Sequence, residues 1–250
     1  MLKLIAIVSM FIDHLHGTVL DQANLMALGM DMSGSAALGQ GMYLVGRLAF
    51  PLFAFLIGEG CRHTHNAPRY VGRLLTFALI AEVPYNWAFY QSFPLFATNN
   101  VLFTLALGAV CCLLFTRIRE EHKTPRTLVL ALIAVFLLGM AAEAWGTEGG
   151  ALGVWMVFVP YALGKKPLQL ASMAVLLWIF YVGSMWLHGS FGWSNMETWL
   201  ASLASLVCIG FYNGQRGKKR GKWFFYWFYP GHLAFLAGAN ALLTPLLAAL

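Results

Sequence analysis

Charged residues are scarce in this chain. Asp, Glu, Lys and Arg make up 10% of its 250 residues, against about a quarter in an ordinary soluble domain. Hydrophobic residues make up 60%, and apolar runs of roughly 20 residues, the length of a bilayer-crossing helix, recur from end to end. The sequence therefore predicts an all-α, polytopic transmembrane helical bundle, with residues 1–250 forming a single integral membrane domain.

Cysteine is also rare, and its spacing excludes a disulfide scaffold or a zinc site of the CxxC kind. The cysteines, all in or beside apolar runs, are Cys61, Cys111, Cys112 and Cys208. We expect them to be packing residues. Asp13, His14 and His16 are close in sequence, but they do not all project together and no second ligand pair has metal spacing. No metal site is predicted.

About nine spans can be drawn along the chain. Their expected ranges are 2–20, 42–60, 70–90, 100–117, 127–145, 151–164, 167–188, 197–212 and 222–247. The sixth is short and contains Pro160, so both a full crossing and a re-entrant segment stay open. The first could be read as a signal peptide, but Asp13 and His14 interrupt its apolar core, and no small-residue cleavage site follows. We expect a retained first helix.

The connecting segments alternate in charge. Basic residues flank every second connection: Lys3; Arg62, Arg69 and Arg73; Arg117, Arg119, Lys123 and Arg126; Lys165 and Lys166; and Arg216, Lys218, Lys219, Arg220 and Lys222. The other connections (21–41, 91–99, 146–150 and 189–196) contain no Lys or Arg. This asymmetry places the N-terminus in the cytoplasm and the C-terminus outside. It also explains the net charge of +6 by topology, without a nucleic-acid partner.

Polar side chains interrupt several spans. Asp13 and His14 are expected near mid-depth in the first span, and His232 at a similar depth in the last. Arg47 is expected inside the second span near the depth of Asp13, where a buried guanidinium needs a carboxylate, either Asp13 or Glu82. Ionisable groups at this depth suggest a functional site, and imidazole is the usual proton-transfer group. A purely structural polar lattice is the alternative.

The third and fourth spans carry further polar groups. Glu82 and Asn86 flank Pro84, which is expected to kink the third span. Asn100 opens the fourth span and shares a face with Thr104 and Gly108. We include Glu82 and Asn100 among the candidate site residues.

Segments along nearly the whole chain resemble the TraX family of integral membrane proteins. The matching segments are Leu2–Ile7, Met10–His14, Gly46–Phe55, Glu59–Gly60, Arg62–Thr64, Arg73–Leu75, Glu82–Asn86, Asn100–Thr104, Tyr212–Gly214 and Phe228–Leu233. The family is named for a protein that acetylates the N-terminus of conjugative pilin, and it is similar to a wider group of membrane acyltransferases with a catalytic histidine in the first span. The resemblance implies a bacterial inner-membrane acetyltransferase and maps that histidine to His14. Gly231 stands where a larger apolar residue is expected.

On this resemblance, acetyl-CoA would bind from the cytoplasm and its pantetheine would thread inward. Its phosphates would be held by some of Arg62, His63, Arg69, Arg73 and Arg216, since guanidinium suits phosphate. His14 would deprotonate the acceptor, a pilin-like protein or a glycan, or carry the acetyl group itself. Asp13 would orient the His14 ring or stabilise its charged form. Arg47, Asn100 and His232 would stabilise the oxyanion or position the acceptor.

Two other functions fit the same residues. Asp, His and Glu side chains near the midplane also form proton relays, so a small proton-coupled transporter is the main alternative, although the two halves show no repeat. A non-catalytic assembly factor, in which the polar groups only order the bundle, is the other.

Overall fold

The computed structural model describes residues 1–91, 98–121, 124–187, 189–215 and 222–247. The described residues are almost entirely helical. The first helices are α1 (Leu2–Thr18), α2 (Gln22–Ala27), α3 (Met32–Gly46), α4 (Ala49–His63), α5 (Ala67–Tyr90) and α6 (Val101–Glu121). The rest are α7 (Pro125–Ala144), α8 (Gly150–Leu163), α9 (Lys166–Trp178), the π-helical segment η1 (Ile179–Gly183), α10 (Ser184–Leu187), α11 (Trp193–Gly210) and α12 (Lys222–Leu247). The all-α prediction is confirmed.

Most predicted spans correspond to one helix within a few residues. The second, 42–60, takes in the end of α3 and most of α4, and the seventh, 167–188, takes in α9, η1 and α10. The connection predicted at 21–41 differs more. That segment was predicted as an external connection, but it contains α2 and most of α3. The signals were present in the sequence, because Asp21 and Asp31 are N-cap residues whose side chains accept hydrogen bonds from the backbone of Asn24 and Gly34. Arg47 and Leu48 form the two-residue turn that joins α3 to α4. The apolar helical stretch Met32–His63 runs through this turn, so Arg47 lies inside a candidate span, as predicted.

The helix starts follow local chemistry. Asn66 caps α5 and Thr124 caps α7 through side-chain hydrogen bonds to backbone N–H groups. α5, α7 and α9 each carry proline in the first turn, where the missing N–H costs no helical hydrogen bond.

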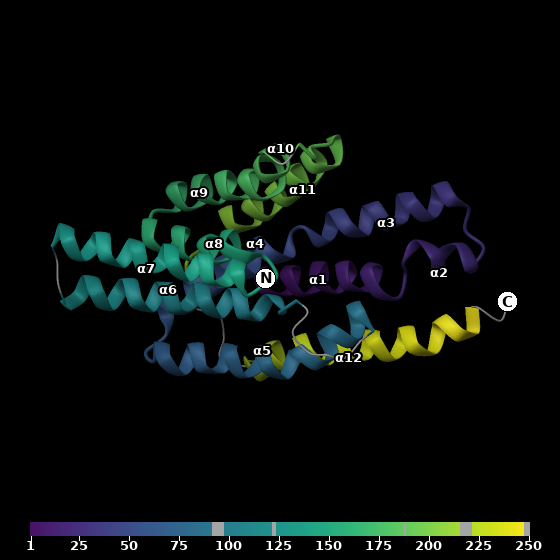
Figure 1. The fold of residues 1–250 in the computed structure, drawn as a ribbon, viewed down its shortest axis with the longest axis horizontal. Helices are drawn as coiled ribbons and strands as arrows, with labels where there is room; N and C mark the ends of the chain where they lie inside the picture. The colour runs from purple at the N-terminus through teal and green to yellow at the C-terminus, as the bar shows by residue number, and fades with distance from the viewer. Residues whose placement is uncertain (92–97, 122–123, 188, 216–221, 248–250) are drawn as a thin grey trace.

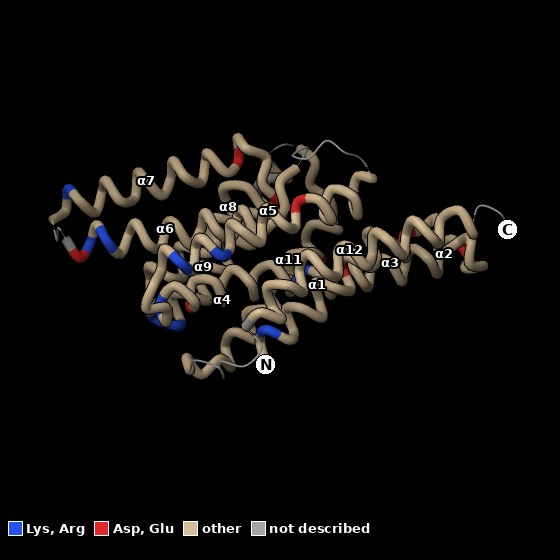
Figure 2. The backbone as a smooth tube through the Cα atoms, turned by 90° about the horizontal axis from the view of Figure 1, so that it is seen from below, with Lys and Arg blue, Asp and Glu red and all other residues tan. Residues whose placement is uncertain are grey.

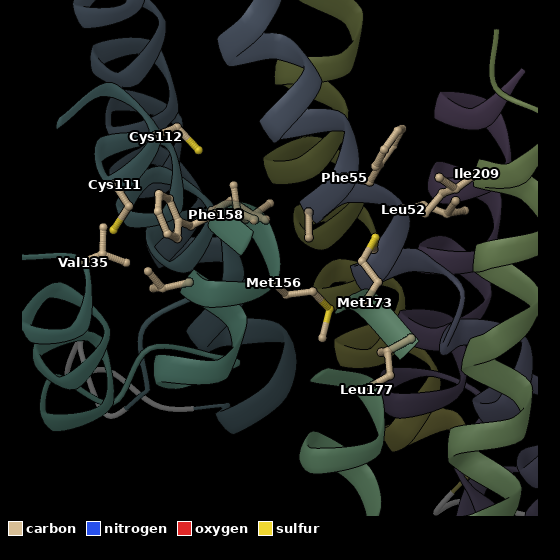
Figure 3. Packing of buried hydrophobic residues seen from close by; sticks show 14 of the residues in the cluster. Leu52, Phe55, Cys111, Cys112, Val135, Met156, Phe158, Met173, Leu177 and Ile209 are labelled. Carbon is tan, nitrogen blue, oxygen red and sulfur yellow. The ribbon is translucent and has the colours of Figure 1, made fainter. Parts of the chain in front are cut away.

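The short helix α8 lies at the centre of one half of the bundle, in contact with α4, α6, α7 and α9 (Figure 1). Small residues allow the close approach. A Cβ at Gly153 would lie 2.6 Å from the Thr104 side chain, and one at Gly108 would lie 2.5 Å from Val157. The side chains around α8 form the main apolar core, as Figure 3 shows; labelled members are Leu52, Phe55, Cys111, Cys112, Val135, Met156, Phe158, Met173, Leu177 and Ile209.

In the other half, α12 lies along α5, and α1 packs against α3, α4 and α12 (Figure 1). The first and last helices of the chain are therefore neighbours.

Cys111 and Cys112 are buried free thiols within the α8 core, as expected for packing cysteines.

The surface fits a membrane protein. Four helical stretches are long and apolar enough to cross a bilayer: Met32–His63, Val101–Glu120, Pro125–Ala144 and Lys166–Gly183. Exposed residues of α7 are largely apolar, including Leu130, Phe136 and Leu137. Figure 2 shows that Lys and Arg gather mainly along one edge of the molecule, from the start of α7 to the N-terminal end of α1. This grouping is the one that alternating basic connections require.

Candidate functional site

Two histidines from opposite ends of the chain meet in the bundle. Nδ1 of His14, on α1, lies 2.8 Å from Nε2 of His232, on α12. Their ring planes differ by 12°. Both are buried, with 8% and 6% of their surface exposed. The similar depth expected for these residues thus corresponds to direct contact, a pairing that was not predicted.

The hydrogen bonds of the pair assign its tautomers. Nδ1 of His232 lies 2.8 Å from the backbone oxygen of Phe228. A carbonyl only accepts, so this nitrogen carries hydrogen, and in the neutral ring Nε2 of His232 is then an acceptor. His14 must donate from Nδ1, which leaves the lone pair of His14 on Nε2. The arrangement therefore provides one free basic nitrogen, and a proton bound there leaves the bond to His232 intact.

Aromatic rings enclose the pair. Phe89 meets His14 edge-on at 5.2 Å between ring centroids, and Phe228 stacks on His232 at 4.9 Å. Tyr229 packs against both imidazoles. Such a shell lowers the local dielectric constant and strengthens electrostatic interactions between the rings.

An apolar groove of about 360 Å³ runs along α12 and reaches His232. It is lined by Phe224, Trp227, Phe228, Gly231, His232 and Phe235. Nothing lies within 4 Å of the position that a Cβ at Gly231 would take, so the glycine leaves this part of the groove open. The groove opens on the exposed face of α12, where Trp227 and Phe235 are 56% and 65% exposed. This opening differs from the expected path, which ran inward from the basic edge.

Asp13 and Arg47 form the predicted ion pair. The Arg47 guanidinium donates to the Asp13 carboxylate at 2.6 Å, and the two side chains are 20% and 23% exposed. Arg47 also donates from Nε to the Tyr43 carbonyl at 3.2 Å, and Tyr181 of η1 interacts with it. A Cβ at Gly46 would collide with the Asp13 side chain, so glycine is needed here.

This geometry corrects the role expected for Asp13. Neighbouring helix residues project about 100° apart, and Asp13 is turned to Arg47 while His14 is turned to His232. His232 holds the His14 ring in the place assigned to Asp13. Arg47, expected to stabilise an oxyanion, already has a carboxylate partner.

Glu82, Asn86 and Asn100 form a separate buried network. The amides of Asn86 and Asn100 donate to the Glu82 carboxylate at 2.9 and 2.6 Å, and the Asn100 backbone N–H donates at 3.2 Å. The three residues are at most 2% exposed. This network joins α5 to the start of α6, and it engages both Glu82 and the Asn100 amide that were expected to act on substrate.

Glu148 is a candidate that the sequence did not reveal. It lies in the connection between α7 and α8, which was read only as a loop without basic residues. Its N–H donates to the Asn99 carbonyl at 2.8 Å, and Thr104 donates to its carbonyl. Its carboxyl interacts with the Tyr85 hydroxyl and the Val101 N–H. Desolvation by the surrounding protein raises the pKa of Glu148 to about 7, although the side chain keeps accessible surface.

At the basic edge, the residues expected to hold phosphate differ in whether they already have hydrogen-bond or ion-pair partners. Arg62 pairs with Glu59 at 3.2 Å and donates to the carbonyls of Pro160 and Tyr161, and His63 lies 3.6 Å from Glu59. The two carbonyl contacts of Arg62 join α4 to α8, whereas the contacts with Glu59 lie within α4. Arg69 is exposed, Arg73 has a buried Nε without a hydrogen-bond partner in the described structure, and Arg216 lies outside the described residues.

Among the described residues, no group of three or more His, Cys, Asp or Glu side chains is arranged to hold a metal ion. The fold and its polar sites define a polytopic helical membrane protein with a buried histidine pair between its first and last helices. The family model described as "TraX protein" matches residues 1–240. The chain belongs to the TraX family.

Similar proteins carry related names. "Probable fimbrial assembly protein FimC, serogroup H1" of Dichelobacter nodosus is 31% identical over 236 residues, covering 88% of this chain and 93% of that protein. "Protein TraX" of Escherichia coli is 32% identical over 140 residues, 54% of this chain and 52% of that protein. "Protein TraX" of Escherichia coli strain K12 is 30% identical over 146 residues, 58% of this chain and 51% of that protein. The chain thus spans about half the length of these two relatives. No solved structure matches it.

Proposed function

We propose that this protein is a bacterial inner-membrane acetyltransferase that moves an acetyl group from cytoplasmic acetyl-CoA to an acceptor at the outer side of the membrane. The observation that carries the proposal is the buried His14–His232 pair, which leaves a basic nitrogen, Nε2 of His14, free for a substrate proton. The name of the Dichelobacter nodosus relative, a probable fimbrial assembly protein, supports a pilin-like acceptor. A glycan acceptor stays open.

In the proposed reaction the His14 imidazole first accepts a proton and later returns it. Nε2 of His14 takes a proton from the acceptor amine or hydroxyl as the acceptor attacks the thioester carbon. The carbon–sulfur bond then breaks, and the imidazolium returns the proton to the CoA thiolate. His232 holds the ring through Nδ1 and takes a share of its charge, the role of the carboxylate in a Ser-His-Asp triad. Transient acetylation of His14 Nε2 is the two-step variant.

The basic edge partly fits a CoA nucleotide. Arg69 is exposed and Arg73 is half-buried, and a guanidinium group suits phosphate. Arg62 already contacts Glu59 and α8, so it can bind a CoA phosphate only if these contacts break.

The test is acetyl transfer by the full-length protein in proteoliposomes supplied with acetyl-CoA and an envelope extract from cells that lack the gene. The readouts are extract-dependent release of CoA thiol and an acetyl mass increment on extract proteins or glycans. His14→Gln should remove turnover and leave thermal unfolding in detergent unchanged within error. His16→Gln is the matched control, two residues along the same helix. Transfer by His14→Gln at the wild-type rate would refute the assignment.

A proton-coupled transporter remains the second candidate, because the two contacting imidazoles of His14 and His232 can also form part of a proton relay. In the same proteoliposomes, solute uptake driven by a pH gradient without acetyl transfer would favour it.

A further inference from the structure

Tyr229 carries a buried hydroxyl that none of the assignments above uses. The residue is 5% exposed, and its hydroxyl makes no hydrogen bond within the described residues. Buried hydroxyls nearly always have a partner, because burial without one costs the free energy of desolvation. An unpaired one beside a candidate site therefore calls for an explanation.

The location of Tyr229 supplies it. The ring centroid lies 6.3 Å from that of His14 and 5.6 Å from that of His232. The hydroxyl end of the side chain lies near the backbone N–H of Val101, at the start of α6, and within electrostatic reach of Glu148 and Glu82. The Val101 N–H already faces the Glu148 carboxyl. The Tyr229 hydroxyl is therefore the donor next to the histidine pair that has no partner among the described residues.

The other donors expected for this role are engaged. Arg47 is paired with Asp13, the Asn100 amide donates to Glu82 and to the Ala78 carbonyl, and His232 is bonded to His14. Of the polar groups around the pair, the Tyr229 hydroxyl is left with an unused proton among the described residues.

We infer that the Tyr229 hydroxyl binds the oxyanion of the acyl-transfer reaction. The inference rests on the proposed function. As the acceptor attacks, the electron pair of the thioester carbonyl moves to oxygen, and the hydroxyl stabilises that charge without giving up its proton. When the intermediate collapses, the pair returns to the carbon–oxygen bond, the carbon–sulfur bond breaks and the thiolate takes its proton from His14. Preorganised donors of this kind act mainly on the transition state.

Tyr229→Phe tests the inference because it removes the hydroxyl and keeps the ring. In the acetyl-CoA proteoliposome assay, kcat should fall about a hundredfold while KM for acetyl-CoA stays within about twofold, the pattern for an interaction made only in the transition state. Thermal unfolding in detergent should be unchanged or shifted upward, since the hydroxyl has no partner to lose.

Trp199→Phe is the matched control. Nε1 of Trp199, on α11, is also buried without a hydrogen-bond partner in the part of the chain that the structure describes. This variant therefore removes such a donor away from the histidine pair and should keep the wild-type kcat. A wild-type kcat in Tyr229→Phe would overturn the inference and leave the proposed function standing, and so would an equal loss in Trp199→Phe. Absence of transfer by the wild-type protein would instead overturn the proposed function itself.

Discussion

His14 donates a hydrogen bond across 2.8 Å to His232 and so links the first helix of the chain to the last. The two residues are 218 positions apart in sequence. The link gives His14 one defined tautomer, because the chain of donors ends on the Phe228 carbonyl.

The pair should behave as one catalytic unit. His232→Ala removes the group that orients His14, so we expect the rate of acetyl transfer to fall by about 10²- to 10⁴-fold, the usual contribution of general-base catalysis. Residues that act together are not additive. The variant lacking both imidazoles should therefore be no slower than His14→Ala alone. Rates from single and double variants in proteoliposomes measure this, and independent, multiplying losses would show that the two histidines act separately.

Gly46 should resist substitution because of Asp13. Gly46→Ala would place a Cβ inside the space of the Asp13 side chain and force apart the ion pair with Arg47. We expect a loss of about 1–3 kcal/mol in the free energy of unfolding, the range for overpacking. Gly41, on the same helix, has nothing within 4 Å of its Cβ position.

Gly41→Ala is therefore the matched control and should be neutral or stabilising by up to about 1 kcal/mol, since alanine favours a helix over glycine. Denaturant titration in detergent compares the two variants. Equal effects would contradict the close approach of Gly46 to Asp13.

Asn100 should be a stability residue. Its side chain donates to Glu82 and to the Ala78 carbonyl at 2.6 and 2.8 Å. Asn100→Ala leaves the Glu82 carboxylate short of a donor in a buried site, so we expect a loss of about 1.5–3 kcal/mol. Once allowance is made for the folded fraction, kcat should be close to wild type. A large fall in kcat with unchanged thermal unfolding would instead return Asn100 to the catalytic role first predicted for it.

Glu148 should give stability a defined pH dependence. Desolvation, with the Asp13 carboxylate adding to it, raises the pKa of Glu148 from 4.5 to about 7, against opposing effects of the Tyr85 hydroxyl, Arg47 and the Val101 N–H. Tyr229 also faces it. Between pH 4.5 and about pH 7, the Glu148 carboxyl is protonated in the folded protein and ionised in the unfolded chain. Stability should therefore fall as the pH rises through this window.

Glu148→Gln should remove that part of the pH dependence. The difference in unfolding midpoint between variant and wild type, measured in detergent from about pH 4 to pH 8, should increase in favour of the variant as the pH rises. Groups that titrate in both proteins cancel in this difference. A difference that stays flat would show that the Glu148 carboxyl is as well solvated in the folded protein as in the unfolded chain.

Local chemistry explains which elements were predictable. Helices such as α7 follow from an apolar run that starts at a capping threonine and a proline. The segment 21–41 was misread because it holds neither basic residues nor a long apolar run, although Asp21 and Asp31 mark the two helix starts within it. The membrane depth expected for Arg47 also predicted correctly that it pairs with an acid, because a guanidinium inside a membrane protein requires one.

The sequence by itself determined that the chain is a helical membrane protein, where most of its helices lie and that several of them carry polar residues, because hydropathy and helix periodicity are local properties. Only the tertiary structure decided which partners those polar residues take. His14 with His232, Asp13 with Arg47, and Glu82 with Asn100 are contacts between different helices. A periodic pattern tells which face of a helix is polar, but the neighbour that this face meets is set by how the helices pack. For the same reason the sequence passed over Glu148 and the unpaired hydroxyl of Tyr229, whose significance lies in what surrounds them.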